Sequence, residues 1–199
     1  MAPIPFLTLQ QHMVQKLRKG LPPQLTYHCL DHTLDVLKQA EIIALAEGIS
    51  CADDMLTLKV AALYHDAGFI TTYQNHEAYG CELARQELPG FGFGPEQIET
   101  ICGLIMATKI PQSPRSHLEQ AICDADLDYL GRKDFTRIAR QLFLELHTLR
   151  MVADEEEWDV RQVLFLEKHQ YFTAYSRQKR EKNKQAHLAA LRTKVGLAQ

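Results

Sequence analysis

Apolar side chains recur at intervals of three and four residues along most of the chain, and no stretch alternates as a half-buried strand does. This spacing predicts amphipathic helices, whose ends are marked by proline, glycine and N-capping residues. Helices are expected over residues 6–17, 30–48, 53 or 54–65, 74–87, 95–106, 117–129, 134–149, 158 to about 175, and 178–194. The pattern therefore predicts an all-α fold, a compact helical bundle.

The breaks between these segments are short and carry turn residues. Residues 108–116 contain two prolines and cannot form one helix. Residues 90–94, Gly-Phe-Gly-Phe-Gly, are similar to a phosphate-binding glycine loop, but no strand precedes them, which favours a turn between helices. We find no internal repeat and no linker, so one domain is expected over residues 1–199.

Composition narrows the range of partners. The net charge of −3 provides no general attraction to nucleic acid or to an anionic membrane, and we expect neither as a partner. The basic stretch over residues 177–194 lacks interleaved aromatic residues, which favours a solvated helix face. The five cysteines form no Cys-x-x-Cys motif and are expected to be reduced core thiols. No signal peptide or spanning segment is recognisable, which predicts a cytoplasmic protein.

Potential metal ligands lie on the apolar faces of three predicted helices. His32, His65 and Asp126 each share a helical row with apolar side chains and should point into the core. A carboxylate on such a row is costly unless it is paired or bound to metal. Asp66 follows His65 directly, so both can ligate one ion only near a helix end, which Gly68 is expected to supply. The joint pattern favours a single metal site over four unrelated core residues.

Helical phase separates two neighbouring aspartates. Asp126 faces inward with its apolar row, whereas Asp124 lies on a different face together with Asp128. We therefore expect Asp126 to be the ligand, with Asp124 at most supporting the ligands from outside. Nitrogen and oxygen donors without thiolate suit Mn, Fe, Co, Ni, Mg or Zn equally.

These residues resemble the HD-domain metal-dependent phosphohydrolases, whose ligands follow the order His, His-Asp, Asp. The order corresponds to His32, His65-Asp66 and Asp126, in the contexts HTLDV, LYHDAG and DADLDYLG, and the resemblance covers roughly residues 26–131. It implies an all-helical fold with one divalent metal. It also implies cleavage of a phosphate ester or diester, of a nucleotide or similar small molecule, by a metal-activated water.

The resemblance also implies catalytic candidates beside the metal. Family members with two metals carry a histidine in a His-x-x-x-Gly context, to which His76 corresponds, whereas Thr108 stands where a further histidine would follow. His76 is thus expected to touch substrate or a partial second ion, with an exposed loop histidine as the equal alternative. A general base is not obvious, and Asp66, Glu77 and a metal-bound water are the candidates.

Substrate contacts are predicted from position in the chain. Lys109 and Arg115 lie in the proline-containing loop, where they could bind phosphate if that loop rims the site, and Lys109 is also a catalytic candidate. His28 precedes His32 by one turn and, with His76 and Thr108, is a further candidate for substrate binding.

Three function classes follow. The leading one is a phosphohydrolase with a small phosphorylated substrate, of which a nucleotide is the first expectation. A nucleotide sensor without catalysis, and less favourably a di-iron oxygenase, are the alternatives. An assembly of several copies is compatible with the sequence.

Overall fold

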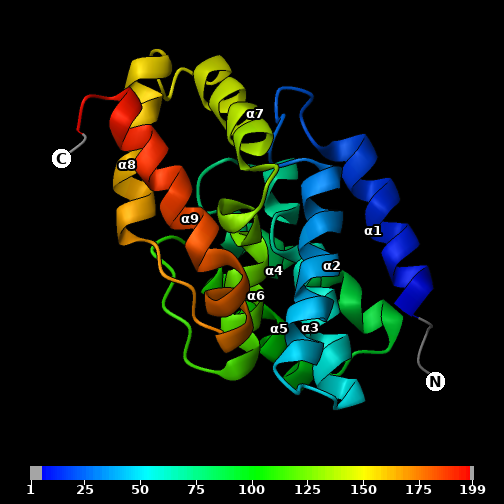
Figure 1. The fold of residues 1–199 in the computed structure, drawn as a ribbon. Helices are drawn as coiled ribbons and strands as arrows, with labels where there is room; N and C mark the ends of the chain where they lie inside the picture. Colours follow the sequence, from blue (N-terminus) through cyan, green and yellow to red (C-terminus); the bar gives the residue numbers. More distant parts are fainter. Residues whose placement is uncertain (1–5, 198–199) are drawn as a thin grey trace.

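The computed structural model describes residues 6–197, and within them it is entirely helical (Figure 1). Nine α-helices and three short 3-10 helices follow one another along the described chain. They are α1 (Phe6–Gly20), α2 (Leu30–Ala46), α3 (Ala52–Tyr64), η1 (Ala67–Ile70), α4 (His76–Glu87), η2 (Leu88–Phe91), α5 (Pro95–Ala107), α6 (His117–Asp126), η3 (Asp128–Gly131), α7 (Phe135–Thr148), α8 (Glu155–Lys168) and α9 (Ala174–Lys194).

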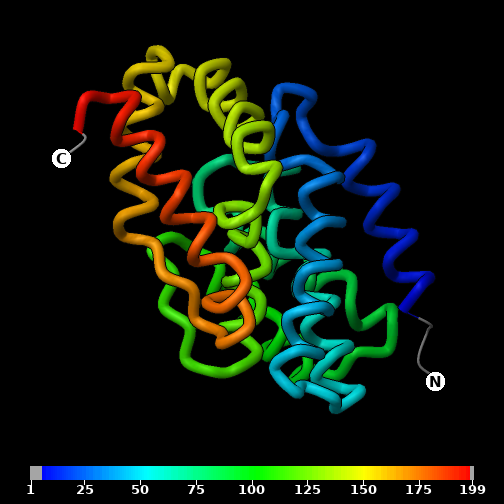
Figure 2. The backbone as a smooth tube through the Cα atoms, in the orientation of Figure 1, coloured from blue at the N-terminus to red at the C-terminus, as the bar shows by residue number. Residues whose placement is uncertain are grey.

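The helices that carry or precede the predicted metal ligands, α2, α3 and α6, form the centre of the bundle. Helix α2 packs against α3 and α6, α3 against α5, and α4 against both η1 and α5. Figure 2 follows the backbone from α1 on one flank, through these helices, to α8 and α9 side by side on the other flank. The apolar rows expected from spacing are buried, with Val36, Ala40 and Ile43 of α2 almost inaccessible to solvent. The all-helical fold predicted from the sequence is confirmed.

Two predicted helices end earlier than expected. The helix predicted over 158–175 ends at Lys168, and residues 169–173 are irregular before Thr173 caps α9 by accepting a hydrogen bond from Ser176 N. The helix predicted over 117–129 ends at Asp126 and continues as the 3-10 turn η3. Apolar spacing did not reveal the break at residues 169–173, because the backbone donors of residues 172 and 173 bond to Asp124, a partner distant in sequence.

The remaining predicted helices are present, with ends displaced by a few residues. The glycine-rich segment forms η2 and a turn, as predicted, and Gly92 adopts the left-handed region there, with φ 87°. All five cysteines are free thiols, but only Cys81, Cys102 and Cys123 are buried, whereas Cys51 is exposed. None of the described helices is long and apolar enough to cross a membrane.

The C-terminal helices dock closely on the motif helices at η3. A Cβ atom added to Gly131 would lie 2.4 Å from the backbone oxygen of Arg180 on α9, so the two backbones touch at this point. Asn183 of α9 donates a hydrogen bond to the Gly131 carbonyl at 3.1 Å. A glycine is required here for close approach rather than for an unusual backbone angle.

We therefore predict that Gly131→Ala lowers the free energy of unfolding by about 1–3 kcal/mol, the usual cost of overpacking. Gly103→Ala is the matched control, because its added Cβ meets open space on the exposed side of α5. The control should stabilise the protein by about 0.5–1 kcal/mol. Urea unfolding followed by circular dichroism measures both changes. Equal stability of the two variants would contradict the close contact.

Candidate metal centre

Two histidines and two aspartates from three helices converge at the centre of the bundle. His32 Nε2 of α2 lies 3.2 Å from Asp126 Oδ1, at the end of α6, and 3.3 Å from Asp66 Oδ2. His65 Nε2, directly after α3, lies 3.4 Å from His32 Nε2, 3.3 Å from Asp66 Oδ2 and 3.6 Å from Asp126 Oδ1. The four residues predicted as ligands are thus brought together.

The end of α3 allows adjacent residues to serve one site. The α-helix ends at Tyr64, and Asp66 already has a non-helical backbone with φ −103° and ψ 2°. Gly68 was expected to end this helix, but it lies in the following turn η1 and not at the helix end. A Cβ on Gly68 would meet the carbonyl oxygen of His76 at 1.9 Å, so glycine there lets α4 approach the site.

The donor set fits a divalent metal ion. The ligand atoms of His32, His65 and Asp66 lie within 4.8 Å of one another, and no second such group is found in residues 6–197. Asp66 Oδ2 is buried without a hydrogen-bond partner, an expensive arrangement that a cation would relieve. Around an ion with bonds of about 2.0–2.2 Å, neighbouring ligand atoms lie roughly 3.0–3.6 Å apart, as these do. His65 Nδ1 donates to the Ala62 carbonyl at 2.9 Å, which leaves Nε2 free to ligate.

The electrostatics of the group show how strongly it requires positive charge. Burial alone would lower the pKa of His32, but its close contacts with the Asp126 and Asp66 carboxylates outweigh burial and raise this pKa to about 9. Burial would raise the pKa of the Asp126 carboxyl, yet its contacts with His32 and His65 lower it to about 2. The same contacts lower the pKa of the Asp66 carboxyl, so both carboxylates favour the ionised form, whose charge protonated imidazoles or a bound metal ion can offset.

Asp124 has a different role from Asp126, in the way that helical phase indicated. Its side chain is fully buried and accepts hydrogen bonds from Phe172 N at 2.9 Å, Thr173 N at 2.8 Å and Thr173 Oγ1 at 2.6 Å. It therefore holds the connection between α8 and α9 and does not contact the four converging side chains.

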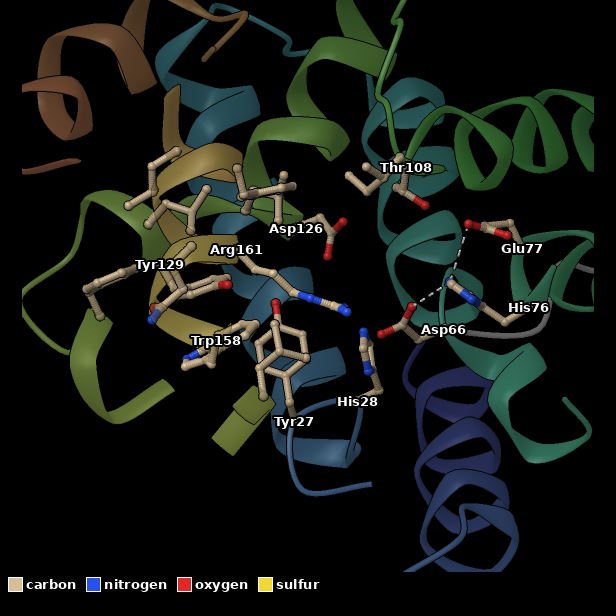
Figure 3. Close-up of a pocket in the computed structure, with 18 residues that line it drawn as sticks. Tyr27, His28, Asp66, His76, Glu77, Thr108, Asp126, Tyr129, Trp158 and Arg161 are labelled. Carbon is tan, nitrogen blue, oxygen red and sulfur yellow. Dashed lines mark ion pairs between the residues drawn. The ribbon is translucent and has the colours of Figure 1, made fainter. Parts of the chain in front are cut away.

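A cavity of about 270 Å³ opens beside the group (Figure 3). Six of the side chains predicted for metal, catalysis or substrate line it: His28, Asp66, His76, Glu77, Thr108 and Asp126. His76 Nε2 lies 3.4 Å from Asp66 Oδ1 and 3.6 Å from Glu77 Oε1, so His76 reaches the site rather than lying exposed in a loop.

Two predicted residues are not brought to the cavity. The Lys109 ammonium donates to Asn75 Oδ1 at 3.2 Å on the outer surface. Arg115 is exposed, and its backbone N–H bonds to Glu119 in the cap of α6. Neither side chain lines the cavity, although Ile110 of the same loop does. The structure therefore gives no support to the roles predicted for Lys109 and Arg115 in substrate binding, or for Lys109 in catalysis.

Sequence reasoning missed a buried glutamate behind the site. Glu145 of α7 is fully buried, and its Oε2 accepts the backbone N–H groups of Tyr27 at 2.9 Å and His28 at 3.0 Å. Its Oε1 bonds to His28 Nδ1 and accepts the Tyr73 hydroxyl at 3.1 Å. A carboxylate on the apolar row of Ile138 and Leu142 was the signal that could have revealed it.

Residues of α8 that line the cavity also escaped prediction. Trp158 and Arg161 enter it from α8, which begins at Glu155, well after the last predicted ligand, Asp126 (Figure 3). No pattern in the nearby sequence predicts that these two side chains line the cavity, because their position depends on how α8 packs against the rest of the bundle.

The comparisons with known proteins agree with this geometry. The HD domain family model matches residues 29–128, and the chain belongs to the HD-domain superfamily. A solved structure, described as a predicted HD superfamily hydrolase from an uncultured Thermotogales bacterium, is similar with a TM-score of 0.62 and 22% sequence identity. The similarity covers 98% of this chain and 95% of that one, so the fold is shared over nearly its whole length. No curated protein matches the chain.

The two aspartates of α6 allow a matched test of the metal site. Asp126→Ala should abolish metal retention, because it removes one of two carboxylates from the donor set. Asp124→Ala should retain metal but lower the free energy of unfolding by about 2–5 kcal/mol, since it leaves three donors unpaired, two of them buried. Metal content after dialysis, by mass spectrometry, and urea unfolding in chelator measure the two effects. Metal loss in the Asp124 variant alone would reverse the assignment.

Proposed function

We propose that the protein is a metal-dependent phosphohydrolase that cleaves a phosphate ester of a small molecule. The observation that carries the proposal is the group formed by His32, His65 and Asp66, with Asp126 Oδ1 3.2 Å from His32 Nε2, at the wall of a cavity. Membership of the HD-domain superfamily supports hydrolysis, as does the description of the similar solved structure as a predicted hydrolase.

Charge balance at the site suits an anionic substrate. Asp66 and Asp126 together offset the two positive charges of a divalent ion, so the ion and these two carboxylates carry no net charge that would repel a phosphate. When bound, the ion would polarise a phosphoryl oxygen and lower the pKa of a coordinated water toward neutrality. Glu77 and Asp66 line the cavity as the carboxylates available to accept the proton of an attacking water.

His28 is placed to donate a proton to the leaving group. Glu145 holds its Nδ1, so Nε2 is the nitrogen available to the cavity. The buried carboxylate fixes the orientation of the ring. Acting as the acid requires the imidazolium form, in which both ring nitrogens carry protons. Phe69 stacks on His28 with ring centroids 4.3 Å apart and on His76 at 3.9 Å, which holds both imidazoles at the same wall. An oriented proton donor favours catalysis over a sensor that only binds its ligand.

Metal dependence is the first test. Chelation should abolish hydrolysis in a screen of nucleotides, cyclic nucleotides and generic phosphoesters, and a divalent metal should restore it. His65→Ala and Asp126→Ala should lose at least roughly 1,000-fold in kcat/KM because the ion polarises the reacting phosphoryl group. His117→Ala, a change at an exposed histidine, is the control and should retain activity. Full turnover in both ligand variants would overturn the proposal.

The proton donor can be tested through the leaving group. His28→Asn should slow hydrolysis of alkyl phosphates by about 100- to 10,000-fold, because their alkoxide leaves poorly without a proton. Nitrophenyl phosphate, with a good leaving group, should be affected much less. Glu145→Gln should show the same dependence in weaker form, because it acts by orienting His28. A uniform loss across all leaving groups would exclude His28 as the acid.

A further inference from the structure

The cavity beside the metal group has two chemically different halves. The carboxylates and histidines lie on one side, whereas Tyr129 and Trp158 lie on the other (Figure 3). We call this second half the apolar chamber, and its side chains come from η3, α7 and α8. They include Tyr129, Phe135, Leu142, Trp158, Phe165 and Leu166. Burying an apolar group against such a surface makes binding more favourable. The same surface offers few hydrogen-bonding groups to a sugar.

Cationic side chains are scarce in the cavity. Arg161 is the one lysine or arginine among the described residues that line it, against the carboxylates Asp66, Glu77 and Asp126. A polyphosphate would bring several negative charges, each of which needs a cation or donors when it leaves water. One metal ion and one arginine suffice for a single phosphoryl group. The volume of about 270 Å³ also indicates a small ligand, since small-molecule sites usually range from about 300 to 1,000 Å³.

Arg161 lies where it can bind that phosphoryl group. It projects from α8 between Trp158 and Phe165, which share its helix face at spacings of three and four. Its guanidinium points toward the space between Asp126 and His28 (Figure 3). Glu157 holds Nη2 at 2.5 Å, but the side chain is 49% exposed, so this ion pair is weak and leaves the guanidinium available. A guanidinium binds two phosphate oxygens at once.

We propose that the substrate is a monophosphate ester of a small apolar alcohol or phenol. Arg161 binds its phosphoryl oxygens opposite the metal, and the apolar chamber takes its organic group. This inference rests on the proposed phosphohydrolase function and narrows its substrate class away from nucleotides. Arg161, Trp158 and Phe165 are then the residues that determine specificity.

Trp158 makes occupancy of the chamber directly observable, because it is the only tryptophan of the chain. Metal-loaded protein is titrated with phenylphosphonate, methylphosphonate and inorganic phosphate. Phenylphosphonate should change the tryptophan fluorescence and bind roughly 10- to 100-fold more tightly than methylphosphonate, as expected for burial of one ring. Equal affinities, with no fluorescence change, would overturn the inference.

Adjacent residues of α8 provide matched variants. Phe165 lines the chamber, whereas Leu164 is 49% exposed. Phe165→Ala should remove most of the preference for phenylphosphonate, and Leu164→Ala should leave it unchanged. Arg161→Gln should weaken both phosphonates by roughly 10-fold or more without altering their ratio. Calorimetry measures these affinities, and an unchanged ratio in Phe165→Ala would contradict the assignment of the chamber.

Turnover separates this inference from the function on which it rests. Benzyl phosphate and a nucleoside 5′-monophosphate release alcohols of similar acidity, so their kcat/KM values compare binding of the organic group. Benzyl phosphate should be preferred by at least roughly 10-fold. A preference for the nucleotide would overturn the inference while leaving phosphohydrolase activity established. Absence of turnover with every ester would contradict the proposed function, and the phosphonate affinities would still decide what the chamber binds.

Discussion

This structure depends on the charge of two carboxylates at the centre of a helical bundle, one of them buried and the other 14% exposed at the cavity. Removing Asp66 and Asp126 from water costs several kcal/mol for each charge unless a cation or an imidazolium compensates. The contacts of both carboxylates with His32 and His65 show the compensation available within the chain. Compensation works only at short range, so α2, the end of α3 and the end of α6 must meet within a few ångströms. The packing of α2 against both α3 and α6 satisfies this requirement.

The same short acidic stretch also attaches the C-terminal part of the chain. Asp126 faces the metal group, whereas Asp124 binds residues 172 and 173, and Asp128 Oδ1 accepts a hydrogen bond from Arg180 Nε at 2.8 Å. Three aspartates spaced by two residues thus point to two sides of one segment: the middle one contacts the candidate ligands, and the outer two bind the C-terminal part of the chain. This arrangement ties the position of α8 and α9 to the helix that carries the ligand Asp126.

The cavity exists because of that attachment. Helices α7 and α8 form the wall opposite the metal group and add the apolar chamber, Arg161 and Glu145. The helices α2, α3 and α6 position the candidate metal ligands, and helices α7 and α8 line the apolar chamber, to which we assign the selection of substrate under our proposal. Changes in the C-terminal helices can therefore alter specificity without disturbing the donor set.

The sequence by itself determined the helices, the inward direction of His32, His65 and Asp126, and the distinction between Asp126 and Asp124. These features follow from a period of 3.6 residues and the cost of an unpaired buried charge, both of which are local. Only the tertiary structure decided the break at residues 169–173, the partnership of His28 with Glu145, and the entry of Trp158 and Arg161 into the cavity. It also placed Lys109 and Arg115 outside that cavity. Each of these features depends on contacts between distant segments, for which helical spacing carries no information.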